Sequence, residues 1–127
     1  MDIRQFKLTN DEEIICEVVE WNDDEHDTMV VRGALKIIAI DDTSHSMRYY
    51  TFKPWMMMNN DPKSLQVLNS YHIVSECAPT KVALEHYRDV ISEMVIDDIE
   101  EQIEEIDMKI SEALIGDSVD SNELIIH

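Results

Sequence analysis

Glycine and proline are scarce in this chain of 127 residues, which contains only 2 glycines and 3 prolines. So few glycines exclude the glycine-rich loops that cradle nucleotide phosphates, and the sharp turn that exposes a hydrolase nucleophile is also missing. Cys77 and His72 could form a nucleophile and a base, but they lie five residues apart around one strand. We expect them to face different surroundings, and the sequence predicts a protein that is not an enzyme.

Cysteines and long apolar runs are also few. The two cysteines, Cys16 and Cys77, lie in apolar stretches, which favours buried thiols over a disulfide framework. The first residues lack a charged-then-apolar leader, and no apolar run approaches the roughly 18 residues of a membrane-spanning helix. We therefore expect a soluble, cytoplasmic protein that is not associated with a membrane.

Basic residues are outnumbered, with 10 Lys and Arg against 28 Asp and Glu, for a net charge of −18. Residues 1–79 carry 7 basic and 14 acidic side chains, whereas residues 80–127 carry 3 and 14. This charge favours solubility and repels a phosphate backbone. Any nucleic-acid binding therefore starts from an electrostatic disadvantage.

Metal-binding patterns are missing as well. The acidic segment 23–27 surrounds His26 with carboxylates, but it lacks the alternating ligands and the turn glycine of a calcium loop. The five histidines show no zinc spacing. The sequence predicts a solvated hairpin loop here, and neither a metal nor another cofactor.

Residues 5–79 are rich in β-branched and aromatic residues, and polar clusters interrupt them at the short intervals of an all-β domain. Gly33 lies in the middle of the longest run, where a bulge or bend is expected. Five short, bent strands favour closure, because a barrel has no exposed sheet edges. We predict a mainly β fold, a small five-stranded, bent, antiparallel SH3-like barrel. Its strands are expected in the runs 6–8, 13–21, 28–40, 47–58 and 65–79.

An acidic α-helix is predicted after this barrel. Thr80 can cap it, apolar residues recur at steps of three and four from Leu84 to Leu114, and Gly116 is a natural stop. The narrow apolar seam needs a partner, either another helix or the barrel. The predicted organisation is a barrel domain at 1–79, a helix at 80–116 and a mobile tail at 117–127, with residues 80–127 removable without unfolding the barrel.

The polar segment Asn69-Ser70-Tyr71-His72 interrupts the last apolar run. An amide, a hydroxyl, a phenol and an imidazole on one turn can stack on a base and hydrogen-bond its edge without net charge. A plain polar turn is the alternative interpretation.

The order of these features resembles the Sm-like, or LSm, family, particularly the divergent versions carried by marine bacteriophages (cyanophages). Residues 8–34 resemble the first Sm motif, with Trp21 at its aromatic position, and residues 67–79 resemble the second. Asp11 and Cys16 replace glycines of the family pattern, and Asn69-Ser70 replaces its Arg-Gly pair.

The resemblance implies a Sm-type barrel that assembles into a closed homo-oligomeric ring, pentamer to heptamer, by pairing the fourth strand of one subunit with the fifth of the next. It also implies RNA binding at loops that face the pore. The candidate nucleic-acid-binding residues are His26, Asp27, Thr28, Asn69, Ser70, Tyr71 and His72. The candidate interface residues are Tyr49, Tyr50, Phe52, Trp55, Met57, Ile73 and Val74.

Two functions follow from these observations. The first is a non-enzymatic ring that binds single-stranded RNA or DNA in phage-linked RNA processing or regulation, in the host cell cytoplasm. Phosphate contacts are then expected from Arg32, Arg48, Lys53 or Lys63. The second is a protein-interaction scaffold that presents acidic helices to a protein partner without binding nucleic acid. Loop pattern favours the first and charge favours the second.

Overall fold

The computed structural model describes residues 1–126, with side chains described through Ile115. It divides into two compact units, Met1–Val95 and a second that begins at Ile96. The first unit contains all of the strands and the start of the helix. The second continues the helix.

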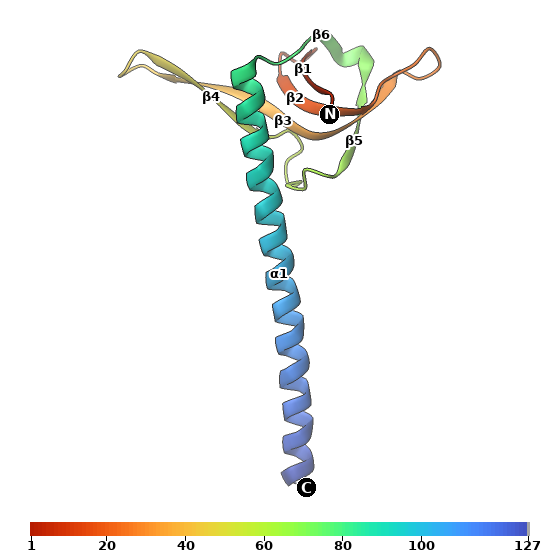
Figure 1. The fold of residues 1–127 in the computed structure, drawn as a ribbon, viewed down its shortest axis with the longest axis vertical. Coiled ribbons are helices and arrows are strands. Elements are labelled where there is room, and N and C mark those ends of the chain that lie inside the picture. The colour runs from red at the N-terminus through yellow and green to blue at the C-terminus, as the bar shows by residue number, and fades with distance from the viewer. Residues whose placement is uncertain (127) are drawn as a thin grey trace. The chain divides into compact units, whose positions relative to one another are not determined.

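The first unit is built on a six-stranded sheet in which every ladder is antiparallel (Figure 1). This confirms the predicted mainly β fold followed by a helix. The elements are β1 (Ile3–Leu8), β2 (Glu13–Glu20), β3 (Thr28–Asp42), β4 (Met47–Pro54), β5 (Leu65–Asn69), the 3₁₀ turn η1 (Ser70–His72), β6 (Ile73–Cys77) and α1 (Lys81–Ile126).

Strand β3 organises the sheet because it pairs with three other strands. Its first part pairs with β5 from Thr28 to Arg32, and its second part pairs with β4 from Leu35 onwards. Gly33 lies between the two parts with φ of 58°, a conformation that glycine adopts without steric cost. The predicted bend in the longest strand is therefore confirmed, and Figure 1 shows β3 crossing the whole unit.

The predicted closed, five-stranded barrel needs correction. The strand order is β4-β3-β2-β1-β6, with β5 on β3, and the described residues contain no ladder that joins β6 to β4 or β5. Turn η1 divides the fifth apolar run into β5 and β6 and directs β6 onto β1. Residues 55–64 separate β4 from β5, so the fourth run ends at Pro54 instead of continuing to residue 58. The sheet is bent and remains open.

Two apolar clusters form the core on opposite faces of the sheet. Strand β2 contributes to both, since Ile14 and Cys16 belong to one cluster and Ile15 to the other. Successive side chains of a strand point to opposite faces, so a strand covered on both sides needs a nearly continuous apolar run. This explains why the alternation in residues 13–20 is imperfect.

The start of α1 completes the second cluster. The backbone N–H of Ala83 donates to Thr80 Oγ1 at 3.2 Å, which confirms the predicted cap. Tyr87 is buried among Ile3, Ile15, Leu35 and Phe52, and further apolar residues of this helical segment pack around them. The compact unit accordingly extends to Val95, beyond the boundary at residue 79 that composition suggested.

The helix also ends later than the sequence indicated. It passes through Gly116 and continues to Ile126, because a single glycine costs a helix only about 1 kcal/mol relative to alanine. His127, the last residue of the predicted tail, lies outside the described residues, and the mobility of residues 117–127 stays a prediction. In the described part of the chain, no helix is long and apolar enough to cross a membrane.

Candidate nucleic-acid interface

The two predicted binding segments meet in the structure. The backbone N–H of Ser70 donates to the carbonyl oxygen of Asp27 at 2.7 Å, and Ser70 Oγ donates to the same oxygen at 2.6 Å. Thr28 and Asn69 are register partners where β3 and β5 pair. Segments 26–28 and 69–72, far apart in sequence, therefore form one surface.

Most of the second segment is held in place by hydrogen bonds, one within the segment and others to Thr9. Asn69 Oδ1 accepts a hydrogen bond from the backbone N–H of Tyr71 at 3.0 Å and so caps η1. The backbone N–H of Thr9 donates to the His72 carbonyl at 2.9 Å, and Thr9 Oγ1 lies 3.2 Å from His72 Nδ1. Tyr71, in contrast, is 73% exposed. Its ring is the side chain of this segment that is best placed to stack on a base.

Thr9 is a member of the site that sequence reasoning missed. It follows the last residue of β1, and Leu8 pairs with Ile73 of β6, so the pairing of these two strands carries Thr9 to His72. The sequence Thr9-Asn10-Asp11 is typical of a polar turn, but only the strand pairing connects that turn to the site.

The first segment lies in an acidic loop that is held by hydrogen bonds to its own Asp23. Asp23 Oδ1 accepts hydrogen bonds from the backbone N–H groups of Glu25 and His26 and lies 2.8 Å from His26 Nδ1. The contact with the His26 ring is the main cause that lowers the pKa of Asp23. His26 is therefore engaged by its own loop. The neighbouring carboxylates of residues 23–27 repel phosphate, so a nucleic acid must approach this surface with its bases.

Two of the four candidate phosphate contacts are already neutralised by carboxylates of this chain. Arg32 forms a two-pronged pair with Glu17, with nitrogen–oxygen distances of 2.6 and 3.0 Å. Arg48 Nε donates to Asp41 at 2.7 Å. Lys53 and Lys63 form no ion pair with the side chains that the structure describes. Half of the candidate phosphate contacts are therefore occupied within this chain.

The candidate interface residues divide into exposed and packed side chains. Tyr49, Tyr50, Met57 and Val74 are exposed. Trp55 and Ile73 are half-buried against the first core cluster. Phe52 is only 9% exposed, and its ring centroid lies 4.7 Å from that of His86, so the structure places it in the core of its own subunit.

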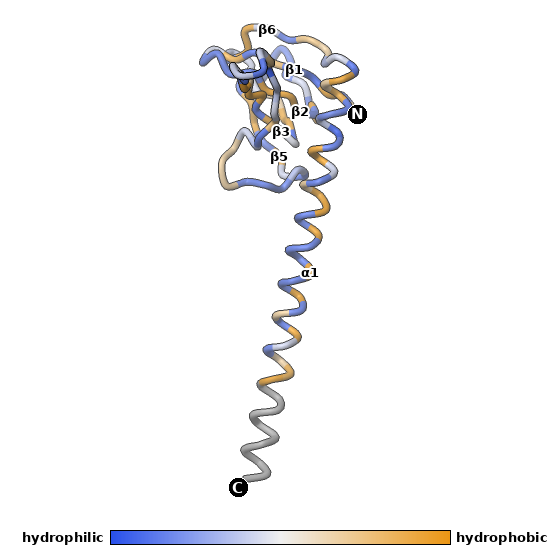
Figure 2. Tube along the Cα trace, turned by 90° about the vertical axis from the view of Figure 1, so that its left-hand side faces the viewer, coloured by the Kyte–Doolittle hydropathy of each residue, from blue (hydrophilic) through white to orange (hydrophobic). Residues whose placement is uncertain are grey.

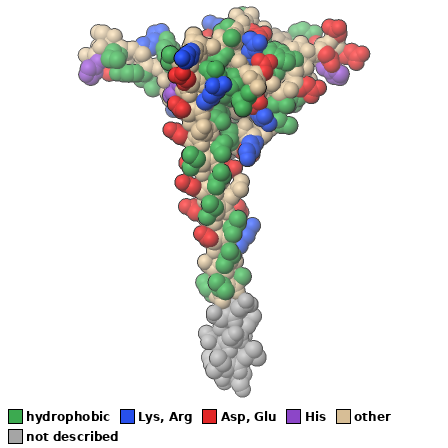
Figure 3. Space-filling view, viewed as in Figure 1, with side chains coloured by type: hydrophobic (Ala, Val, Ile, Leu, Met, Phe, Trp, Pro, Cys, Tyr) green, Lys and Arg blue, Asp and Glu red, His purple; other side chains and the backbone are tan. Residues whose placement is uncertain are grey.

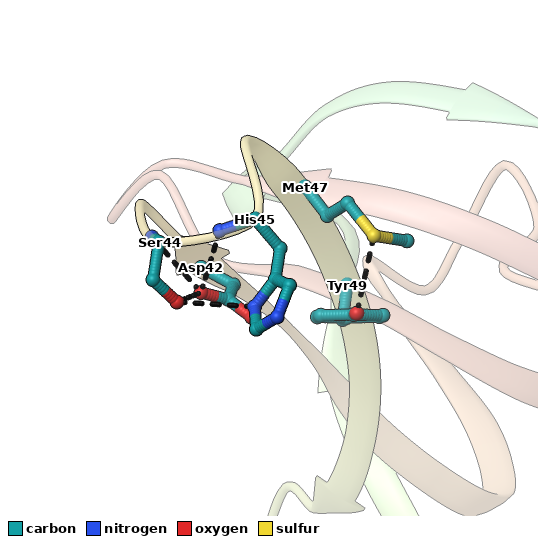
Figure 4. Close-up of polar contacts among 5 residues, drawn as sticks. All are labelled: Asp42, Ser44, His45, Met47 and Tyr49. Carbon is teal, nitrogen blue, oxygen red and sulfur yellow. Dashed lines mark hydrogen bonds and ion pairs between the residues drawn. The ribbon is translucent and has the colours of Figure 1, made fainter.

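The exposed tyrosines lie on the β3–β4 hairpin, whose tip is held by Asp42 (Figure 4). Asp42 Oδ1 accepts hydrogen bonds from the Ser44 backbone N–H at 3.1 Å and from Ser44 Oγ at 2.6 Å. Oδ2 of the same carboxylate lies 2.8 Å from His45 Nδ1. Beyond the tip, Tyr49 donates to the sulfur of Met47 at 3.4 Å. A hairpin held by hydrogen bonds at its tip thus presents exposed apolar side chains to its surroundings.

The sheet also has open edges. Within the described residues, β6 pairs only with β1, and both β4 and β5 pair only with β3. Unpaired edges expose backbone N–H and C=O groups that can bond to a strand of another chain. Val74 on β6 and Tyr50 on β4 lie on two such edge strands.

The bent antiparallel sheet with two loops meeting at one surface defines a small, mainly β domain. A family model, the Sm_like domain, matches residues 5–88, and the chain therefore belongs to the Sm-like family. A search of the curated proteins finds no match to the chain. Members of the family are generally non-enzymatic, typically bind RNA and form oligomeric rings. The matched region includes Tyr87, in agreement with the compact unit described above.

Proposed function

We propose that this protein is a non-enzymatic Sm-like protein that binds single-stranded nucleic acid, RNA or DNA, at the surface formed by residues 26–28 and 69–72. The observation that carries the proposal is the double hydrogen bond from Ser70 to the Asp27 carbonyl. It joins the two segments that correspond to the two Sm motifs and leaves the ring of Tyr71 exposed beside them.

Base stacking on Tyr71 supplies the affinity in this proposal, and His72, Asn69 and Thr28 supply polar groups at its sides. Each base–aromatic stack contributes about 1–3 kcal/mol. Phosphate contacts are few in this proposal, because Arg32 and Arg48 are paired with carboxylates and, of the four candidates, Lys53 and Lys63 alone have no ion pair with a described side chain. The affinity should therefore depend only weakly on salt, unlike that of a protein that neutralises many phosphates.

The proposal includes a homo-oligomeric ring, pentamer to heptamer. The open edges of β4, β5 and β6 and the exposed side chains of Tyr49, Tyr50 and Val74 support it. Pairing these edges between subunits would satisfy their backbone groups, and it would repeat the Tyr71 surface around the ring. Such repetition raises the affinity for a strand that contacts several subunits at once.

We assign this activity to phage-linked RNA processing or regulation in the host cell cytoplasm, because the motifs resemble the versions carried by marine bacteriophages. The acidic composition and the exposed apolar residues of the helix support the alternative, a scaffold that presents acidic helices to a protein partner.

Fluorescence anisotropy with labelled homopolymeric RNA and DNA, at two salt concentrations, distinguishes the two functions. The protein should first be characterised by light scattering, so that its oligomeric state is known. We expect binding of at least one single-stranded oligomer at both salt concentrations. If no oligomer is bound at either concentration, the proposed function is refuted and the scaffold remains.

A further inference from the structure

The second unit exposes a line of isoleucines along one face of the helix. The side chains of Ile96, Ile99, Ile103, Ile106 and Ile110 are each between 48% and 55% exposed. Figure 2 shows apolar and hydrophilic residues alternating along α1, and Figure 3 shows apolar side chains as a line flanked by acidic ones. We call these five residues the isoleucine seam.

The spacing of the seam is that of a coiled coil. Its residues follow one another at alternating steps of three and four, which places Ile96, Ile103 and Ile110 at the a positions of a heptad repeat and Ile99 and Ile106 at the d positions. Ala113 occupies the next d position. Such a repeat keeps one narrow face of a helix turned towards its partners.

Charge is sorted around the seam. Residues 96–115 contain 8 acidic side chains and a single lysine, Lys109. Six of the acidic residues fall on positions b, c and f, which face solvent in a coiled coil. These six are Asp97, Asp98, Glu101, Glu104, Glu105 and Glu112.

We propose that the isoleucine seam packs against the same seam of other copies of this chain, in a parallel, in-register bundle of three or more helices. The residue type at the seam sets the number of helices. Isoleucine at both a and d positions disfavours two-stranded coiled coils and favours trimers and tetramers. A dimer would require a different residue, typically leucine, at the d positions.

The charges beside the seam select identical, parallel copies. The two acidic residues at e positions are Glu100 and Asp107. In a parallel bundle each e residue faces the g residue five positions earlier in the neighbouring helix, and those residues, Val95 and Gln102, are uncharged. In an antiparallel arrangement e faces e, which brings Glu100 against Asp107 and is unfavourable. The parallel register avoids this repulsion.

The high negative charge of each helix predicts how salt affects the bundle. Bringing several such helices together raises the repulsion among their carboxylates, and salt screens that repulsion. Association of the helices should therefore strengthen as salt is added. A basic protein partner on the same face would give the opposite dependence, because salt weakens attraction between opposite charges.

Cysteine cross-linking of the full-length chain tests the proposal. Cys77 is exposed and is replaced by serine, whereas Cys16 is buried and is kept. In this background Ile103→Cys and Ile110→Cys place thiols on the seam, and the adjacent Glu104→Cys and Ser111→Cys place them on the solvent side as matched controls. Mild oxidation is followed by denaturing electrophoresis without reductant, and light scattering gives the mass of the unoxidised protein.

We expect both seam variants to form covalent dimers at least tenfold faster than their controls, and more readily at high salt. Cross-linking of a seam variant at the rate of its control, or a reduction of cross-linking by salt, would overturn the proposal. The outcome is independent of nucleic-acid binding and of ring formation. A ring without a helix bundle gives a high mass and no selective cross-link, and a bundle without a ring gives a selective cross-link and the mass of a trimer or tetramer.

Discussion

The hydroxyl of Tyr87 donates a hydrogen bond to the carbonyl oxygen of Gly33 at 2.8 Å. This bond fastens the first turns of α1 to the bend of β3. A Cβ atom at position 33 would lie 2.7 Å from the Tyr87 oxygen and 3.1 Å from Ile91. The bend therefore needs glycine for two reasons, its left-handed backbone and the close approach of the helix.

Gly33→Ala should destabilise the protein. The left-handed backbone costs a non-glycine residue roughly 1–2 kcal/mol, and the new methyl group displaces Tyr87. Tyr87→Phe should cost about 1–3 kcal/mol, because the buried Gly33 carbonyl loses its partner. Urea unfolding of both variants and of the double variant measures the coupling. We expect the double variant to lose less stability than the sum of the two, since removal of the hydroxyl relieves the clash. If the two losses of stability simply add, the contact between Tyr87 and position 33 does not contribute to the free energy of unfolding.

Removal of the helix at residue 79 should unfold the sheet. Tyr87 is 3% exposed, and the loss of one large buried aromatic side chain costs roughly 3–5 kcal/mol, a large share of the about 5–15 kcal/mol that holds a typical domain folded. We expect a fragment 1–95 to melt cooperatively by circular dichroism and a fragment 1–79 to show no cooperative transition. Equal melting of the two fragments would show that the β domain folds without the helix and ends at residue 79, as composition suggested.

The two cysteines should differ in reactivity. Burial raises the pKa of Cys16 to about 12, and the thiolate is the reactive form. Cys77, in contrast, is exposed, so the prediction of two buried thiols is wrong for this residue. A colorimetric thiol reagent at pH 8 should therefore modify one cysteine quickly in the native protein and both in urea. Cys77→Ser provides the control, in which the native protein should show no fast reaction. Fast modification of Cys16 would contradict its burial.

The pair between Glu17 and Arg32 should make stability sensitive to acid. The hydrogen bond from Arg32 lowers the pKa of Glu17 below its ordinary value of 4.5. A carboxyl group with a lowered folded pKa stabilises the protein above its unfolded pKa, and that contribution is lost as the pH falls from about 4.5 through the folded value. Urea midpoints measured between pH 6 and 3 should fall less steeply for Glu17→Gln than for the wild type. If the urea midpoints of the two proteins fall in parallel with pH, the pair between Glu17 and Arg32 contributes nothing to the acid sensitivity of stability.

Much of the fold could be predicted because its signals are local. The bend at Gly33, the cap at Thr80 and the break at residues 69–72 each depend on the residue type at one position. The packing of Tyr87 against Gly33 could not be predicted in this way, since a continuous apolar stripe does not reveal where a helix changes partners. The open sheet was missed for a similar reason, because closure depends on which strands far apart in the sequence pair with each other.

Sequence reasoning named residues for the candidate site but could not give their arrangement. The motif resemblance suggested that segments 26–28 and 69–72 belong together, but the double hydrogen bond between Ser70 and Asp27 requires the turn geometry of η1. Phe52 was grouped with exposed aromatics. It shares a face of β4 with Tyr50, but Phe52 packs with Tyr87 in the second core cluster, whereas Tyr50, two residues nearer the hairpin tip, is exposed. The participation of Thr9 depends on a pairing of distant strands that no local pattern encodes.

Nucleic-acid binding by Tyr71 variants tests the central proposal most directly. Tyr71→Ala should weaken binding of single-stranded RNA or DNA by about 1–3 kcal/mol, or roughly 5- to 150-fold in Kd, whereas Tyr71→Phe should retain most of the affinity because the ring is kept. Val82→Ala serves as the control, since Val82 is also exposed but lies in the first turn of α1, outside both the proposed binding surface and the proposed ring interface. Each variant is assayed by anisotropy at a concentration where light scattering shows the wild-type oligomeric state. Wild-type affinity in Tyr71→Ala, or an equal loss in Tyr71→Phe, would contradict base stacking at this surface.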